Sequence, residues 1–414
     1  MLFRSMGLNA PYNVGTFQTA GVTQPGKFGY DIGFNQNVPL VKFDAAGKPL
    51  VGLVGFSAAD PNIRSAYLYQ YNVGIQRRLG HDFSLELDYQ GSAGHKLGLF
   101  VDQNQPTVTV VDPSRRGNQF PNVQTFPYPT FGSVGTGNSL GNSIYNGGVL
   151  TFKYQSRKGY FIQSSYTLGK SIDTNSAYFG SAGESSSPAN PRQINLERGP
   201  SSFDTRQRFV TVYNLDLPIG PGHRLMGSNN AINRGVFGGW TMSGITSIQT
   251  GQPFTVNNSS ADFSGFNQSA DRPDLLGSGP VSTNFSDPDN AFDVTRFGCS
   301  RTATGALTGC PNPPTGRVGT SGRNQYYGPH LANYDFTMQK AFRLWGERSK
   351  LTFRSDFFNL FNHTNFSNPV RNLSNANFGR ITQTVGSAVA TAVGTTAGAV
   401  GGARQIQFVV RLTF

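Results

Sequence analysis

The sequence predicts an all-β protein, an antiparallel transmembrane β-barrel with long extracellular loops and short periplasmic turns, present here as its C-terminal and incomplete part. Three observations predict this fold. The composition is rich in aromatic residues and poor in charge, apolar residues alternate with polar ones in separate segments, and shorter connections alternate with longer ones along the chain.

The composition suits a wall with one lipid-facing side and one water-facing side. Among 414 residues there are 51 Gly, 33 Phe and 16 Tyr, while charged residues make up 14%, against about 25% in a typical soluble domain. Hydrophobic residues account for only 37%, so a larger apolar core does not replace the missing charge. The net charge is +12, but Lys and Arg are scattered, so we expect no nucleic-acid partner.

The C-terminal end shows the alternation most clearly. There, five apolar residues share one face of the expected strand, and Val409 is the one apolar residue on the other: Ile406, Phe408, Val410, Leu412 and Phe414. The same period of two recurs upstream, at residues 67–75, 83–89, 150–154, 160–168, 209–217, 240–248, 334–338 and 351–357. Strands of about ten residues span an outer membrane when they are tilted.

The connections alternate in length and so predict which end of each strand faces the periplasm. Tight turns are expected at residues 77–82, 157–159 and 344–347, and a medium connection at 218–238. Long polar connections are expected at residues 91–148, 169–206, 251–332 and 359–403. Barrels in outer membranes place short turns in the periplasm and long loops outside.

This alternation also predicts the organisation of the chain. The last strand descends, so Phe414 is expected at the periplasmic rim, and counting back makes the strand at Tyr67 descend as well. Residues 1–64 are therefore expected to be an outer-loop segment of a truncated barrel, and residues 65–414 its C-terminal strands and loops. No signal peptide follows Met1, so we expect an N-terminal region to be missing.

Two cysteines, Cys299 and Cys310, lie in a stretch rich in Pro, Gly and Thr. No histidine lies near enough to complete a zinc site with them. A loop disulfide is favoured over two free thiols, and it would place the stretch in an oxidising compartment.

No arrangement of residues predicts catalysis. The five histidines have no metal-ligand spacing, and neither a phosphate-binding loop nor a nucleophile elbow is present. Residues 287–290 are better interpreted as a turn than as a calcium loop. Glu86, Asp88 and Asp356 lie on polar strand faces, where they are expected to line a lumen and to pair with bases such as Arg354. The sequence therefore predicts no enzyme, no catalytic, cofactor-binding or metal-binding residues and no cofactor.

Several motifs in combination resemble one family. Residues 203–210, 239–254 and 353–366, together with 69–76, are similar to barrel motifs of TonB-dependent outer-membrane receptors of the Oar-like group. The run that ends at Phe414, with Ile406, Phe408, Val410 and Leu412, resembles the terminal signal read by the barrel-assembly machinery. The resemblance covers roughly residues 60 to 414.

The resemblance implies a barrel of about 22 strands, an N-terminal plug and a segment that engages TonB. The implied place is the outer membrane of a Gram-negative bacterium. The implied partners are outer-membrane lipid, the barrel-assembly machinery, an unknown solute, and TonB only through a missing N-terminal region.

The expected function is the barrel part of a receptor or transporter that takes up a large solute, a glycan or a peptide. A self-contained outer-membrane porin or adhesin without active transport is the alternative. A secreted, soluble, sugar-binding β-protein is a third reading, and its outward face would be polar. The sequence singles out no loop residue that contacts a ligand.

Overall fold

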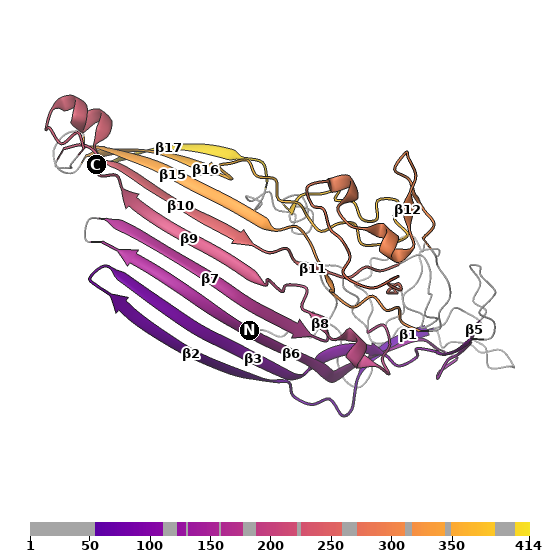
Figure 1. Ribbon diagram of the computed structural model, residues 1–414. Coiled ribbons are helices and arrows are strands. Elements are labelled where there is room, and N and C mark those ends of the chain that lie inside the picture. Colours follow the sequence, from indigo (N-terminus) through magenta and orange to yellow (C-terminus); the bar gives the residue numbers. More distant parts are fainter. Residues whose placement is uncertain are drawn as a thin grey trace, which may run out of the picture.

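The computed structural model describes residues 54–110, 122–129, 131–156, 159–176, 188–221, 225–258, 271–310, 317–343, 349–385 and 402–414. Its main feature is a curved sheet in which long antiparallel strands follow one another in chain order (Figure 1). These strands are β2 (Tyr67–Leu79), β3 (Phe83–Asp102), β6 (Phe131–Gln155), β7 (Tyr160–Asp173), β9 (Gln207–Asp216), β10 (Trp240–Gln249), β15 (Leu331–Arg343), β16 (Lys350–Phe358) and β17 (Gln405–Thr413). The predicted antiparallel β-structure is confirmed, and each alternating segment falls on one of these strands.

The register of the strands brings the apolar sets onto one face of the sheet. Across the first half, cross-strand partners run in the order Ile75, Leu87, Leu150, Tyr166 and Phe209. Across the second half, Phe336, Phe357 and Ile406 are successive partners, and Met338 lies opposite Met242. A one-residue slip at any ladder would turn a whole strand over, so this agreement makes one continuous apolar surface.

This apolar surface is exposed, whereas the polar face is more enclosed. The relative exposure is 68% for Val73 and 56% for Leu87, while Glu86 and Asp88 beside Leu87 are half-buried. A soluble β-sandwich has the opposite arrangement, because exposing apolar surface to water costs about 25 cal/mol per Å². The inverted pattern is that of a wall in contact with lipid, and it excludes the soluble reading.

Aromatic side chains border the apolar face at both ends. At one end Tyr67 and Tyr69 lie with their ring centroids 5.4 Å apart, and Tyr71 is 6.2 Å from Tyr89. At the other end the rings of Phe83 and Tyr154 stack at 4.6 Å. Such belts mark the two interfaces between hydrocarbon and headgroups.

The outer connections carry the shorter elements. Among the residues that the structure describes, these are β1 (Val54–Ala59), β4 (Thr107–Val110), β5 (Asn122–Thr125), η1 (Ile194–Glu197), β8 (Gly199–Pro200), β11 (Pro253–Phe254), η3 (Pro288–Asn290), η4 (Val294–Phe297), β12 (Ser300–Arg301), β13 (Leu307–Thr308) and β14 (Tyr326–Tyr327). The connection between β9 and β10 lies at the opposite end and holds η2 (Asn233–Phe237). The C-terminus also lies at this short-turn end (Figure 1).

One predicted connection was too long. The segment 91–148 was expected as a loop, but β3 continues to Asp102 and β6 begins at Phe131, with pairs such as Val101 and Thr136. Beyond the lipid a strand needs only its ladder hydrogen bonds, so Gly, Ser and Asn continue it without apolar alternation. β1, which pairs in parallel with the outer part of β6, was not predicted from the sequence.

Some expectations concern residues outside the described part of the chain. These are the turn residues 157–158 and 344–347, and residues 1–53 of the expected outer-loop segment. Within the described part, no helix has the length and apolarity needed to cross a membrane.

The described sheet is open. β2 and β17 are its two edges, and in the described ranges they do not pair with each other. The path from β17 to β2 contains nine strands. Neighbours are antiparallel and nine is odd, so both edge strands run toward the short-turn end. Antiparallel closure would therefore require a further strand, or another odd number of strands, between them.

Replacing Leu87 with Arg tests the lipid-facing surface. Placed near mid-membrane, the arginine should destabilise the folded barrel by about 2–4 kcal/mol, measured as the free energy of unfolding of the full-length protein from lipid vesicles. Thr151→Arg is the matched control, because Thr151 lies opposite Glu86 on the polar face of the sheet. Equal stability of Leu87→Arg and wild type would contradict the assigned face.

Candidate functional site

The outer loops contain the apolar core that the sheet lacks. Nine buried residues from four segments pack together: Phe254, Val256, Phe292, Val294, Phe297, Cys299, Tyr326, Leu373 and Phe378. Aromatic rings dominate the contacts, and the ring centroid of Phe292 lies 5.1 Å from that of Tyr326 and 5.7 Å from that of Phe297. We call the described parts of the chain around this core, residues 251–258, 271–310, 317–330 and 366–385, the outer loop module.

Short ladders and a disulfide hold the outer loop module together. β11 pairs with β14, β12 pairs with β13, and a disulfide joins Cys299 to Cys310. Gly298 adopts a left-handed conformation with φ of 72° at the end of η4, a conformation that glycine adopts without steric cost. This turn brings Cys299 into the core and directs the chain into the β12–β13 hairpin.

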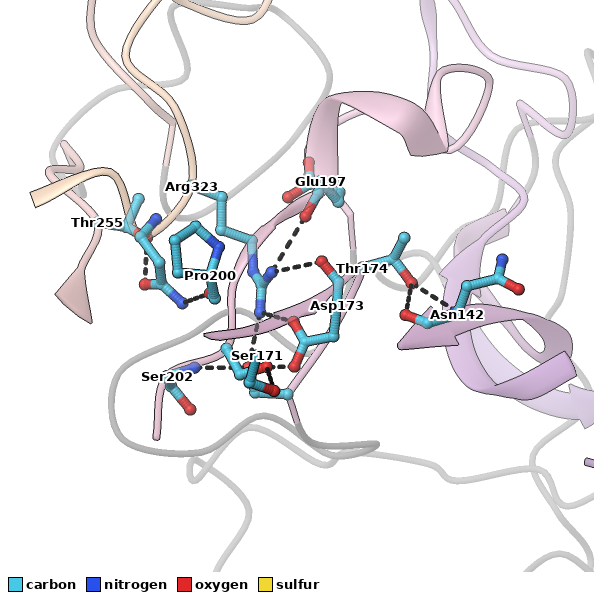
Figure 2. A network of polar contacts seen from close by, with 12 residues as sticks. Asn142, Ser171, Asp173, Thr174, Glu197, Pro200, Ser202, Thr255 and Arg323 are labelled. Atoms are coloured by element: carbon cyan, nitrogen blue, oxygen red, sulfur yellow. Dashed lines mark hydrogen bonds and ion pairs between the residues drawn. The ribbon is translucent and has the colours of Figure 1, made fainter. Parts of the chain in front are cut away.

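A buried arginine ties the outer loop module to the barrel wall (Figure 2). Arg323 donates one hydrogen bond of 2.7 Å to the Asp173 carboxylate at the end of β7 and others to the backbone carbonyls of Asp173 and Glu197, both at 3.1 Å. Both partners of this ion pair are almost fully buried. A buried pair stabilises little in itself, but removing one partner leaves the other charge unpaired and buried away from water.

A second buried pair lies beside the first. The guanidinium of Arg272 approaches the carboxylate of Glu197 at 3.4 Å, and it donates a hydrogen bond of 3.1 Å to the carbonyl of Leu196. Arg272 and Arg323 thus both contact η1 and its flank. Together they connect the loop after β7 to the loop after β10.

Asp204 belongs to the motif at residues 203–210, and its contacts show what this motif does in the structure. Its buried carboxylate accepts a hydrogen bond of 2.6 Å from the amide of Ser171 and one of 3.0 Å from the hydroxyl of Tyr327. Burial raises the pKa of Tyr327 to about 12, and the negative charge of Asp204 acts in the same direction. Asp204 therefore links β7, β14 and the start of β9.

Two asparagines of the motif at residues 353–366 hydrogen-bond to the backbone at the outer ends of the strands. The side chain of Asn365 pairs with the backbone of Ala332 in both directions, at 2.7 Å and 2.8 Å, as a strand neighbour would. Asn359 donates to the carbonyls of His363 and Gly402, both at 2.8 Å, and has a φ of 51° that asparagine tolerates better than most residues. These amides close the outer ends of β15, β16 and β17.

A pocket of about 430 Å³ with a mixed polar and apolar lining opens between three loops at this end. Its lining includes Ser202, Gln252, Asn324, a run at residues 367–372, and Gln383. Amide and guanidinium groups come from Gln252, Asn368, Arg371 and Gln383, and apolar contact comes from Pro253, Phe254, Pro369 and Val370. Side chains of this kind hydrogen-bond to hydroxyl and peptide groups while packing against their carbon faces.

The polar face of the sheet holds the carboxylates considered in the sequence analysis. Asp356 forms an ion pair of 2.8 Å with Arg354 and accepts a hydrogen bond of 2.7 Å from Thr337. Glu86 and Asp88 lie on the same face of β3, opposite Thr151 and Val149. Within the described ranges, no cluster of three or more His, Cys, Asp or Glu side chains could hold a metal ion.

The C-terminal residues singled out in the sequence lie on β17 and just after it. Ile406, Phe408, Val410 and Leu412 are exposed on the apolar face, and Phe414 is 93% exposed at the short-turn end. They do not approach the pocket. Neither the pocket nor the loop core was predicted from the sequence. Period-two pairs such as Phe254 with Val256 and Phe292 with Val294 were the available signal for the core.

Comparison with known proteins gives one family and distant structural likenesses. The family model described as outer membrane beta barrel domain matches residues 2–407. No curated protein matches the chain. The outer membrane transporter YddB from Escherichia coli is similar with a TM-score of 0.41 and 10% identity, over 88% of this chain and 34% of that one. The FpvAI–pyocin S2 complex is similar with a TM-score of 0.34 and 10% identity, over 84% of this chain and 26% of that one. The chain thus spans about a third or less of these structures' chains.

Replacing Arg323 with Ala should loosen the outer loop module without unfolding the wall. The uncompensated Asp173 carboxylate should cost about 3–5 kcal/mol, seen as faster proteolysis and faster hydrogen exchange in residues 251–330. Arg317→Ala is the control, because Arg317 is 54% exposed in its pair with Asp274, and such surface pairs contribute about 0–1 kcal/mol. Equal protection in the two variants would contradict the anchoring role of Arg323.

Tyr327 should make the outer loop module sensitive to alkali. Its pKa is raised from 10.0 to about 12 in the folded protein, so the folded state keeps the proton that the unfolded state loses. The resulting stability is complete below pH 10 and is lost as pH rises toward 12. Loop protection followed across this range should fall in the wild type and fall less in Tyr327→Phe. A pH profile unchanged by this substitution would rule out Tyr327 as the source.

Proposed function

Because the chain belongs to the outer membrane beta barrel domain family, we propose that it is the C-terminal barrel part of a TonB-dependent receptor of the Oar-like group. In this proposal the receptor takes up a large solute, a glycan or a peptide. The chain resides in the outer membrane, and its proposed activity is transport rather than catalysis. The proposed division is an outer-loop segment at residues 1–64 and barrel strands and loops at residues 65–414.

The observation that carries the proposal is the ordered outer loop module with its pocket, whose lining combines amide and apolar side chains. A pore that only sieves solutes needs no apolar core or buried ion pairs in its loops. Here the two arginine pairs hold loops from distant parts of the chain in one arrangement. Pre-ordering of this kind lowers the entropy cost of binding a solute.

The chemistry of the pocket supports a glycan or a peptide as the solute. Both ligands present closely spaced donors and acceptors beside apolar faces. The amides of Gln252, Asn368 and Gln383 offer donors and acceptors together, while Pro253 and Phe254 offer apolar contact. The pocket is small compared with a large solute, so it would hold one sugar ring or a few peptide groups of it.

The open sheet is consistent with the proposed wide barrel. Bacterial single-chain barrels have an even number of strands, and the described sheet has nine in its path with edges that run in the same direction. Further strands would widen the lumen, which the polar face of the sheet lines. TonB would engage the receptor only through an N-terminal region, which would also supply the plug.

Features of the C-terminal strand favour the proposal that the barrel-assembly machinery recognises it. Ile406, Phe408, Val410 and Leu412 lie on one exposed apolar face of the strand, which Phe414 follows. β17 pairs with β16 on one side, and its other side is a sheet edge. A machinery that captures this edge by strand pairing would read the alternating side chains at the same time.

Energy dependence of uptake tests the proposal. Cells that express the full-length gene would be given fluorescent oligosaccharides and fluorescent peptides, with and without a protonophore and with and without TonB. We expect periplasmic accumulation of one class that is lost without the proton gradient or without TonB. Entry unaffected by either treatment would mean a porin, and surface binding without entry would mean an adhesin; both results would reject active transport.

Pocket variants test the solute site separately. Asn368→Ala or Gln383→Ala removes a pocket amide and should weaken apparent affinity about tenfold, the equivalent of about 1.4 kcal/mol. Asn377→Ala is the matched control, because Asn377 is an exposed asparagine of the same loop that does not line the pocket. Equal uptake by all three variants would place the solute site elsewhere.

A further inference from the structure

The connection between β9 and β10 is a folded element at the periplasmic end of the barrel. Asn230 caps its short helix by accepting a hydrogen bond of 2.6 Å from the amide of Asn233. The side chain of Asn233 donates to the carbonyls of Met226 and Ser228, at 2.9 Å and 3.1 Å. We call residues 225–239, which include η2, the rim clasp (Figure 1).

The register shows which side of the wall the rim clasp lies on. Lys340 of β15 lies opposite Trp240 on one side and opposite Phe353 on the other, and Phe353 lies opposite Val410. All belong to the apolar, lipid-facing surface. Lys340 is therefore a cation on the lipid side of the barrel, close to the short-turn end of its strand.

The rim clasp covers this lysine. The Nζ of Lys340 donates to the carbonyls of Val236 and Gly238, both at 2.8 Å, and lies 4.8 Å from the Trp240 ring centroid. The indole nitrogen of Trp240 donates to the same Val236 carbonyl at 2.8 Å. Lys340 is only 4% exposed as a result. These bonds hold the rim clasp against the lipid-facing side of the wall, not beneath the lumen.

The rim clasp turns apolar side chains outward. Leu225, Met226, Ile232 and Val236 are each between 51% and 65% exposed. The sequence from residue 217 to 240 contains Arg224 and Arg234 and no acidic residue. Apolar side chains combined with positive charge are typical of segments that lie in the interface of a membrane with anionic lipids.

We propose that the rim clasp is a membrane-interface anchor that inserts Leu225, Met226, Ile232 and Val236 into the inner leaflet of the outer membrane. The apolar surface of the rim clasp continues that of the barrel wall, so the same phospholipid chains would contact both. Arg234, which is exposed on the helix, would then lie at the level of the lipid phosphates. The proposal rests on the barrel's place in the membrane and is independent of what the barrel transports.

A fluorescent probe on the rim clasp tests the proposal. The full-length protein would be placed in nanodiscs of phosphatidylethanolamine and phosphatidylglycerol, with an environment-sensitive dye on Ile232→Cys. The matched control is His81→Cys, an exposed position on the tight turn at the same end of the barrel. The disulfide between Cys299 and Cys310 leaves these native thiols unreactive toward the dye.

We expect the dye at position 232 to emit at a shorter wavelength than the dye at position 81, and to be quenched by phospholipids that carry a quencher on their acyl chains. Equal emission at both positions without quenching would overturn the proposal. A shift that appears only in cells, with no quenching in nanodiscs, would overturn it too, since the rim clasp would then contact a periplasmic protein.

The role of Lys340 has its own test. Lys340→Met in the labelled protein should return the emission at position 232 toward that of the control, because the rim clasp loses both carbonyl contacts. Heat-modifiable migration in electrophoresis would show that the barrel itself remains folded. Unchanged emission and quenching in this variant would overturn the assignment of Lys340 as the anchor point.

Discussion

One constraint underlies the whole structure: in hydrocarbon, every backbone amide and carbonyl needs a partner within the protein, while the side chains must be apolar. A curved sheet satisfies the first demand through its ladders. The register satisfies the second by aligning Ile75, Leu87 and Leu150 with their counterparts as far as Ile406. The exposed apolar face and the aromatic belts follow from this constraint. Lys340 is a cation on the same face, and the carbonyls of Val236 and Gly238 bind its ammonium group.

Outside the lipid the arrangement is reversed, with apolar side chains buried and polar ones exposed to water. In the outer loop module water surrounds the protein, so Phe292, Phe297 and Phe378 are buried and charged groups would ordinarily be exposed. Arg272 and Arg323 are nevertheless buried, each against a carboxylate and backbone carbonyls. Such pairs add little stability, but they fix which loops meet, because any other arrangement leaves a charge unpaired.

The sequence predicts well what depends on neighbours in the chain and poorly what depends on distant contacts. Period-two alternation located all nine long strands of the described sheet, since lipid on one side leaves a periodic pattern in the sequence. It failed where β3 and β6 continue beyond the lipid, to Asp102 and from Phe131, because there only the ladder is required. Arg323 and Asp173 are 150 residues apart, and no local pattern relates them. The pocket, made by residues from three loops, was undetectable for the same reason.

The connections at the two ends of the barrel differ in length and in what they bury. At the periplasmic end the other connections are short. The connection between β9 and β10 is longer, and in our proposal the apolar side chains of its rim clasp insert into the membrane. At the outer end, loops of tens of residues would remain disordered without burying apolar surface of their own. The loop core therefore has to form before the pocket exists, because Phe254 belongs to both. Recognition at this end is thus tied to the folding of the loops, and a substitution in the loop core would alter binding without touching the solute.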